Sequence, residues 1–120
     1  YTYSRVYKKN AILPMHKDRQ DCEVSLTVHL ASDHDWNFVL QDGDVERNIN
    51  LKPGDALLYN GVDFNHGRPT EYEGEYYAQV FLHYIKAFGK YSAPYNEYLE
   101  KYKQVNKEAP IAPRNKDSDK

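Results

Sequence analysis

A short run of the chain, His16-Lys17-Asp18, places an imidazole and a carboxylate two residues apart. Residues i and i+2 of an extended strand point to the same face, so both side chains can reach one ion. His66, which follows the apolar run ALLY within a polar segment, can supply a third ligand. Two histidines and one carboxylate on one face of an octahedron make the facial triad of non-haem Fe(II) oxygenases, which leaves coordination positions open. The same set also suits Zn²⁺.

The other histidines and the cysteine have simpler interpretations. His29 and His83 lie inside strand patterns and are expected to be core histidines, while His34 in SDHDW is expected in a loop. Cys22 is the single cysteine, so an internal disulfide framework is excluded. No Cys or His stands near it at a spacing typical of a nucleophile, so we interpret it as a small buried residue.

Short alternating or apolar runs separated by turn formers must position these groups. Alternation of period two predicts a strand, and Pro14 marks 11–15 as an edge strand or an irregular entry. We predict an all-β sandwich or barrel and no doubly wound parallel sheet. The polar segment 60–69 is expected to be a loop. The predicted strands are 1–7, 23–30, 36–41, 45–51, 56–59 and 76–85.

The C-terminal part changes character. From Pro94 onward, apolar side chains recur at helical spacing, and proline is tolerated in a first helical turn. We predict that residues 1–90 form the core, that 91–107 form a helix packed on the outside of a sheet, and that 108–120 form a flexible tail. The helical stripe comprises Tyr95, Tyr98, Leu99, Tyr102 and Val105.

Length and composition exclude several classes of protein. The chain has 120 residues, which favours one domain, with 40% hydrophobic and 28% charged residues. A net charge of -2 argues against a large basic face for nucleic acid. No apolar stretch approaches the ~20 residues of a membrane helix, and the N-terminus has no signal-peptide core. The missing initiator Met indicates a processed or cut chain, and the single cysteine suits a reducing cytoplasm.

Three stretches together carry a family resemblance: YSRVYKKNAILPMHKDRQDCEVSLTVHL, LKPGDALLYNGVDFNHGRP and EGEYYAQVFLHYI. They resemble the Fe(II)- and 2-oxoglutarate-dependent oxygenases of the prolyl-hydroxylase-like branch, and among them small members from bacteria and their viruses. The resemblance covers Tyr1 to about Ile85. It implies a double-stranded β-helix, which is a jelly-roll or cupin-like barrel, with Fe(II) on His16, Asp18 and His66.

The resemblance also implies the reaction. The co-substrates would be 2-oxoglutarate and dioxygen, the co-products succinate and CO2, and the outcome hydroxylation of an unactivated C–H. The prime substrate would be a peptide or a small molecule, since fold alone does not fix it.

One departure from the branch concerns the anchor for the far carboxylate of 2-oxoglutarate. Members of the branch carry a basic residue on the strand after the distal histidine, but here no Arg or Lys occurs between Arg68 and Lys86. The available candidates are Arg68, two residues past His66, and Arg5 on the predicted strand face of Tyr7. The resemblance matches Tyr7 to a tyrosine that binds the same carboxylate. Arginine suits this role because it binds a carboxylate with two parallel hydrogen bonds. We favour Arg68 over Arg5 because Arg68 lies on the same element as the proposed metal ligand His66.

Two other functions stay open. A cupin-like fold can hold a metal or a small ligand without redox turnover, and the missing basic residue on the strand after His66 favours this alternative. A zinc site is a weaker alternative. Formation of succinate from 2-oxoglutarate with Fe(II) would separate an oxygenase from both.

Overall fold

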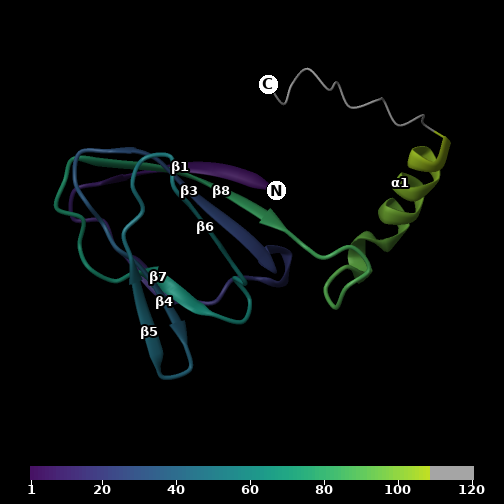
Figure 1. Cartoon of the computed structure of the whole chain (residues 1–120), viewed down its shortest axis with the longest axis horizontal. Coiled ribbons are helices and arrows are strands. Elements are labelled where there is room, and N and C mark those ends of the chain that lie inside the picture. Colours follow the sequence, from purple (N-terminus) through teal and green to yellow (C-terminus); the bar gives the residue numbers. More distant parts are fainter. Residues whose placement is uncertain (109–120) are drawn as a thin grey trace, which may run out of the picture. The chain divides into compact units, whose positions relative to one another are not determined.

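The computed structural model describes residues 1–108. The chain divides into two compact units, Tyr1–Lys86 and Ala87–Lys120. The first unit contains two antiparallel sheets of four strands each, which confirms the prediction of a mostly β fold (Figure 1). One sheet has the order β1 (Thr2–Lys8), β8 (Tyr76–Tyr84), β3 (Val24–Ser32) and β6 (Ala56–Tyr59). The other has the order β2 (Leu13–His16), β7 (Asn65–Arg68), β4 (Phe38–Asp42) and β5 (Val45–Ile49).

The predicted loop at 60–69 is wrong in part, because β7 occupies Asn65–Arg68. The sequence NHGR has low strand propensity, but β7 lies between β2 and β4 and hydrogen-bonds to both. Hydrogen bonding to a strand on each side therefore outweighs the low strand propensity of these residues. His66, Gly67 and Arg68 are all buried in this strand. The other predicted strands agree closely, and 56–59 is observed with identical bounds.

The inner face of the β1–β8–β3–β6 sheet is unusually polar. On β3 the buried side chains are Ser25, Thr27 and His29, while the alternate apolar positions are partly exposed. Buried polar groups must find partners or a ligand. The inner face of β3 therefore adds polar groups to an interior whose hydrophobic core is a cluster of aromatic side chains: Tyr7, Trp36, Tyr72, Tyr77 and Phe81. On β8 the inner-face residues are Tyr77, Gln79, Phe81 and His83, which are likewise buried.

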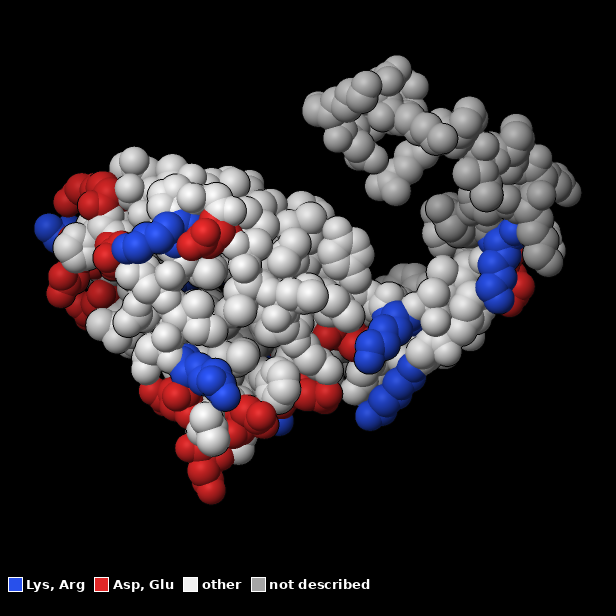
Figure 2. Space-filling model, in the orientation of Figure 1, with Lys and Arg blue, Asp and Glu red and all other residues white. Residues whose placement is uncertain are grey.

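The opposite face of this sheet is apolar and open. Leu58 is 66% exposed and Val6 54%, and both lie on the side opposite Tyr59 and Tyr7. On the side of the molecule shown in Figure 2, the charged side chains of the first unit lie mainly along its margins. The predicted packing of the C-terminal helix would cover an apolar face of this kind.

The second unit contains a 3-10 turn, η2 (Ala93–Tyr95), and the helix α1 (Asn96–Glu108), close to the predicted range. Pro94 stands in the first turn, as expected. Within this unit Tyr95 and Tyr98 stay exposed, so their burial against the sheet remains a prediction. The predicted tail lies outside the described residues apart from Glu108, which ends α1. Among residues 1–108 no helix is long and apolar enough to cross a membrane.

Candidate metal centre

Cross-strand pairing brings the two predicted histidine ligands together. His16 ends β2 and is the register partner of His66 on β7. Side chains of directly opposed residues are neighbours on one sheet face, and the two imidazole rings lie 4.5 Å apart between centroids. Gly67 permits the close approach of these strands, since a Cβ there would lie 2.6 Å from the Leu13 carbonyl oxygen.

Asp18 reaches the two histidines from a loop, not from a strand. The extended i, i+2 argument is therefore incomplete, because β2 ends at His16. The Asp18 backbone N–H donates to the Gly61 carbonyl, 2.8 Å away. A Cβ on Gly61 would collide with the Asp18 carboxylate and would lie 2.7 Å from the Cys22 carbonyl oxygen. Only glycine at position 61 leaves the carboxylate in place.

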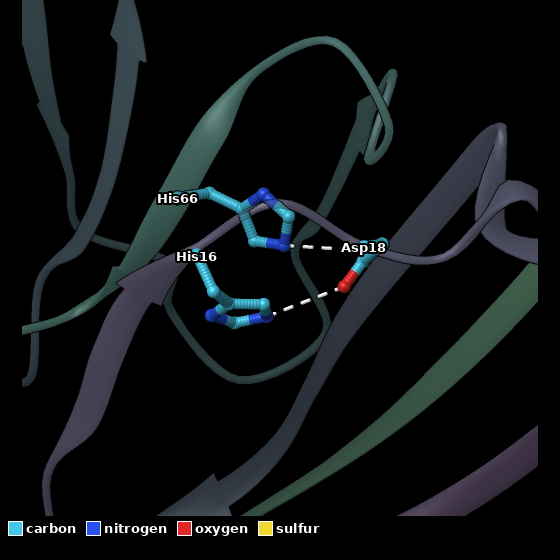
Figure 3. Close-up of side chains that lie close together, drawn as sticks. All are labelled: His16, Asp18 and His66. Atoms are coloured by element: carbon cyan, nitrogen blue, oxygen red, sulfur yellow. Dashed lines mark ion pairs between the residues drawn. The ribbon is translucent and has the colours of Figure 1, made fainter.

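The three side chains converge in the way that a metal site requires (Figure 3). His16 Nε2 lies 3.2 Å from Asp18 Oδ1, and His66 Nε2 lies 3.4 Å from Asp18 Oδ2. Adjacent ligands of an octahedral ion with bonds of about 2.1 Å stand about 3 Å apart. The observed separations are therefore close to those of a loaded site.

Backbone carbonyls fix the tautomer of both imidazoles. His16 Nδ1 donates to the Pro14 carbonyl at 2.7 Å, and His66 Nδ1 donates to the Phe64 carbonyl at 2.8 Å. In a neutral ring the other nitrogen, Nε2, then carries the lone pair. Metal-bound histidines in proteins are oriented in this way. Both lone pairs point toward the Asp18 carboxylate.

The charge state of Asp18 suits a ligand. Burial opposes its ionisation, but hydrogen bonding to His66 and the charges of His66 and His16, which act when those rings are protonated, outweigh that effect and lower its pKa. With the rings in the neutral tautomer described above, a bound cation would take the place of the Nε2 protons. The Ser25 hydroxyl lies 3.4 Å from Asp18 Oδ2. The carboxylate is therefore ionised at neutral pH and available to a cation.

A small cleft opens beside the three side chains, with a volume of about 30 Å³. Arg5 and Tyr7 of β1 lie on its wall, as the strand-face prediction requires. Arg5 is exposed, and its guanidinium carbon lies 5.4 Å from the centroid of the Tyr7 ring. The other lining residues are Tyr3, Leu13, His16, Asp18, Phe38, Tyr59, His66, Phe81 and His83.

Arg68 lies in the interior and not in this cleft wall. Its side chain is fully buried, with its guanidinium carbon 4.9 Å from the Trp36 ring centroid and 4.6 Å from that of Tyr77. It donates to the Trp36 carbonyl, to the Tyr77 hydroxyl at 3.2 Å and to Gln79 Oε1 at 3.1 Å. Burial lowers the pKa of Arg68. All three acceptors are neutral, and none of the ion pairs described within residues 1–108 includes Arg68.

Several polar atoms around Arg68 have no partner within residues 1–108. They are Arg68 Nε, Gln79 Nε2, the Tyr7 hydroxyl and His29 Nε2. Phe38 links this region to the metal ligands, since its ring lies 5.5 Å from the Arg68 guanidinium carbon and 5.8 Å from the His66 ring. Unsatisfied buried polar groups in native structures call for an explanation, such as a bound partner or water. Arg68 Nε, Gln79 Nε2 and the Tyr7 hydroxyl can donate to an anionic ligand, whereas His29 Nε2 can only accept because its Nδ1 donates to the Leu51 carbonyl.

Sequence reasoning missed the surroundings of Cys22. The residue is buried, as predicted, and burial raises the pKa of its thiol. However, the fold brings His83 of β8 close to it and to Asp18. His83 is buried and also lines the cleft, so it is not purely a core histidine. The four-residue spacing of Asp18 and Cys22 was the one available hint in the sequence.

His29 and His34 have the predicted environments. His29 is buried, stacks on Tyr77 with ring centroids 4.2 Å apart, and donates from Nδ1 to the Leu51 carbonyl. His34 is exposed outside the strands, with Nε2 3.1 Å from a Glu73 oxygen.

No protein-family model matches this chain, and no curated protein matches it.

Proposed function

We propose that the chain is an Fe(II)- and 2-oxoglutarate-dependent oxygenase that hydroxylates an unactivated C–H of a peptide or small molecule. The observation that carries the proposal is the convergence of His16, Asp18 and His66, with both histidines held in the metal-binding tautomer. Two neutral imidazoles and one carboxylate are the ligand set of the facial triad. Three protein ligands leave positions for a chelating co-substrate and dioxygen.

The strand order supports a jelly roll, the double-stranded β-helix of the resembling family. Two four-stranded sheets with the orders β1–β8–β3–β6 and β2–β7–β4–β5 are what an eight-stranded jelly roll requires. In this arrangement β2 and β7 hold the two proposed histidine ligands on the inner side, and Arg68 lies two residues beyond His66 on β7. Fold alone does not establish activity, so the proposal depends on the site.

Arg68 is our proposed anchor for the far carboxylate of 2-oxoglutarate. It is a buried cation whose described hydrogen-bond acceptors are all neutral, and Tyr7 and Gln79 offer unpaired donors close by. An unpaired buried charge is costly, so binding of an anion would relieve that cost. Arg5 is exposed in the cleft wall and already solvated, so it gains less from binding a carboxylate. We assign Arg5 to the cleft mouth, where the prime substrate enters.

When bound, Fe(II) and 2-oxoglutarate would activate O2, the oxidant: one oxygen atom goes to succinate as 2-oxoglutarate loses CO2, and the other goes to the substrate. The residues of the chain hold and shield this site. Asp18 contributes the negative charge, and His16 and His66 contribute two neutral nitrogens. Tyr59 and Phe38 pack around the His66 ring, at 4.8 Å and 5.8 Å between centroids, and keep water from that side.

A cupin-like binding module without turnover is the second candidate. The specific observation that favours it is the absence of Arg and Lys from β8, since the positions where the branch has a basic residue hold Glu75, Tyr76, Tyr77 and Ala78. If Arg68 binds the far carboxylate of 2-oxoglutarate, the anchor lies on β7 and no basic residue is needed on β8. An unpaired Cys22 is in keeping with the cytoplasmic location that we also propose.

The test is turnover of 2-oxoglutarate by the purified chain with Fe(II), ascorbate and oxygen, measured as succinate by mass spectrometry. Peptides, free amino acids and nucleotides are screened for a mass gain of one oxygen. We expect succinate from the wild type and none from His66→Ala or Asp18→Ala. Binding of Fe(II) without succinate under any condition would favour the binding module, and greater affinity for Zn²⁺ without turnover would favour a zinc site.

A further inference from the structure

A second group of metal-ligating side chains lies beside the first. Asp18, Cys22 and His83 each place one ligand atom within 4.8 Å of the other two. Cys22 ends η1 (Gln20–Cys22) and is 3% exposed, and His83 on β8 is 5% exposed. Two of the three residues are therefore buried, Asp18 is partly exposed, and the group includes the only thiol of the chain.

The Ser25 hydroxyl contacts all three residues. Its hydroxyl donates to the Cys22 carbonyl at 3.1 Å and lies 2.9 Å from His83 Nδ1 and 3.4 Å from Asp18 Oδ2. Because the hydroxyl has a single proton, a serine that donates to the Cys22 carbonyl accepts from His83 Nδ1. The lone pair of a neutral His83 is then on Nε2, as in the histidines of the first site. A positioned imidazole of this kind is ready to bind a cation.

The chemistry of this group differs from that of the first site. A thiolate, an imidazole and a carboxylate form a softer set than two imidazoles and a carboxylate, and thiolate favours Zn²⁺. Three protein ligands plus water complete a tetrahedral zinc ion. Such an ion, with bonds of about 2.0–2.3 Å, holds its ligands roughly 3.3–3.8 Å apart. Side-chain shifts of about 1 Å would bring the observed group onto an ion.

We propose that Asp18, Cys22 and His83 form a second metal site that binds Zn²⁺ and shares Asp18 with the first site. Asp18 and His83 both line the cleft, which gives the ion a path to the buried thiol. The proposed oxygenase reaction uses Asp18 but neither Cys22 nor His83, so thiolate binding at the second site can be tested separately from the proposed function.

Sharing of one carboxylate makes the two sites antagonistic. An ion on Cys22 and His83 draws an Asp18 oxygen away from His16 and His66. It also adds two positive charges within a few ångströms of the first site. The coupling is reciprocal, because each ion lowers the affinity of the other by the same factor. Zn²⁺ would therefore act as an inhibitor that binds beside the iron position.

Cobalt gives a direct readout, since Co²⁺ replaces Zn²⁺ and its bond to a thiolate gives a strong near-ultraviolet charge-transfer band. Cys22 is the only cysteine, so the band can come from no other residue of the chain. The wild type and His66→Ala are titrated anaerobically with Co²⁺, and then with Zn²⁺ as a competitor. We expect the thiolate band in both proteins and its loss on addition of Zn²⁺. His66→Ala damages the first site but leaves Asp18, Cys22 and His83 intact.

Two variants identify the ligands. Cys22→Ser should abolish the band, and His83→Gln should weaken Co²⁺ binding at the thiolate site by about tenfold or more. Co²⁺ binding without a thiolate band in the wild type and in His66→Ala would overturn the proposal, as would an unchanged band in a folded His83→Gln. Because the wild-type band alone reports the thiol, failure of Cys22→Ser to fold does not affect the decision. Formation of succinate without a Co²⁺–thiolate band would support the oxygenase and reject the second metal site. A Co²⁺–thiolate band without succinate would support the second metal site and reject the oxygenase.

Discussion

Replacement of Arg68 by methionine tests the most unusual group in the interior. Methionine keeps much of the side-chain volume but removes the charge and the donors that face Trp36, Tyr77 and Gln79. In the ligand-free chain two effects oppose each other. Acceptors left unpaired cost about 1–3 kcal/mol each, whereas removal of an uncompensated buried charge recovers several kcal/mol. We therefore expect only a modest change in the melting temperature of the ligand-free protein.

The effect on ligand binding should be much larger. Loss of a buried partner for a carboxylate costs roughly 2–5 kcal/mol. At 1.4 kcal/mol per factor of ten, this raises the Kd for 2-oxoglutarate by about 30-fold to several thousandfold. Arg5→Met is the matched control, because Arg5 is exposed in the cleft wall. Its exposed position predicts a change of about fivefold or less.

Thermal shift in the presence of a redox-inert divalent metal is a suitable assay. A ligand at 100 times its Kd stabilises the folded state by about 2.7 kcal/mol. For a unit the size of Tyr1–Lys86, this corresponds to roughly 10–20 °C in Tm. We expect the wild type and Arg5→Met to show this shift and Arg68→Met to show little of it at the same 2-oxoglutarate concentration. An undiminished shift in Arg68→Met, or its loss in Arg5→Met alone, would refute the reasoning.

Three further predictions concern the site and the loop that supports β8. Asp18→Ala should weaken Fe(II) binding by more than about 100-fold, measured by calorimetry with Mn²⁺ as a stand-in, because the ligand set then has no charge; unchanged affinity would reject the site. Gly61→Ala should destabilise the chain by about 1–3 kcal/mol in urea unfolding and weaken metal binding, because its Cβ meets the Asp18 carboxylate and the Cys22 carbonyl; wild-type values for both would contradict this. The pKa of Asp33 is lowered by hydrogen bonds from the Glu75 backbone N–H and the Tyr72 hydroxyl. Its contribution to stability is thus complete above the unfolded pKa of about 3.9 and is lost as pH falls through the lower folded value. Asp33→Asn should therefore unfold more easily than the wild type at pH 6, with a smaller difference at pH 3; an equal difference at both would exclude the carboxylate as the cause.

The sequence predicts the strands best where an apolar or alternating run is bounded by turn formers. Residues 56–59 and 76–85 satisfy both conditions, and their strands appear within one residue of the prediction. The segment around β7 has no apolar or alternating run. Its residues His66, Gly67 and Arg68 are buried although none of them has a large apolar side chain. Local patterns cannot detect a strand that depends on two neighbours distant in the sequence.

The convergence of the three residues of the candidate metal site was predictable, and their surroundings were not. A histidine and an aspartate two residues apart, plus a later histidine, identified the three residues that the fold brings together. The approach of His83 to Cys22 depends on the pairing of β3 with β8, in which Ser25 is the register partner of His83. Nothing in the alternation of β3 determines that its polar side faces inward. The burial of Arg68 likewise follows from the inner position of β7.

The pairing of His16 with His66 has a consequence for the life of the protein in a cell. An ion bound to both histidines closes a loop of about 50 residues, as a removable cross-link would. By the chain-entropy relation used for disulfides, closure of such a loop is worth about 4 kcal/mol, a sizeable share of the stability of a small domain. Loss of the ion would free the short strand β2 and expose it to proteases. Cellular abundance of this chain should therefore follow metal supply, with degradation of the ion-free form faster than that of the loaded form.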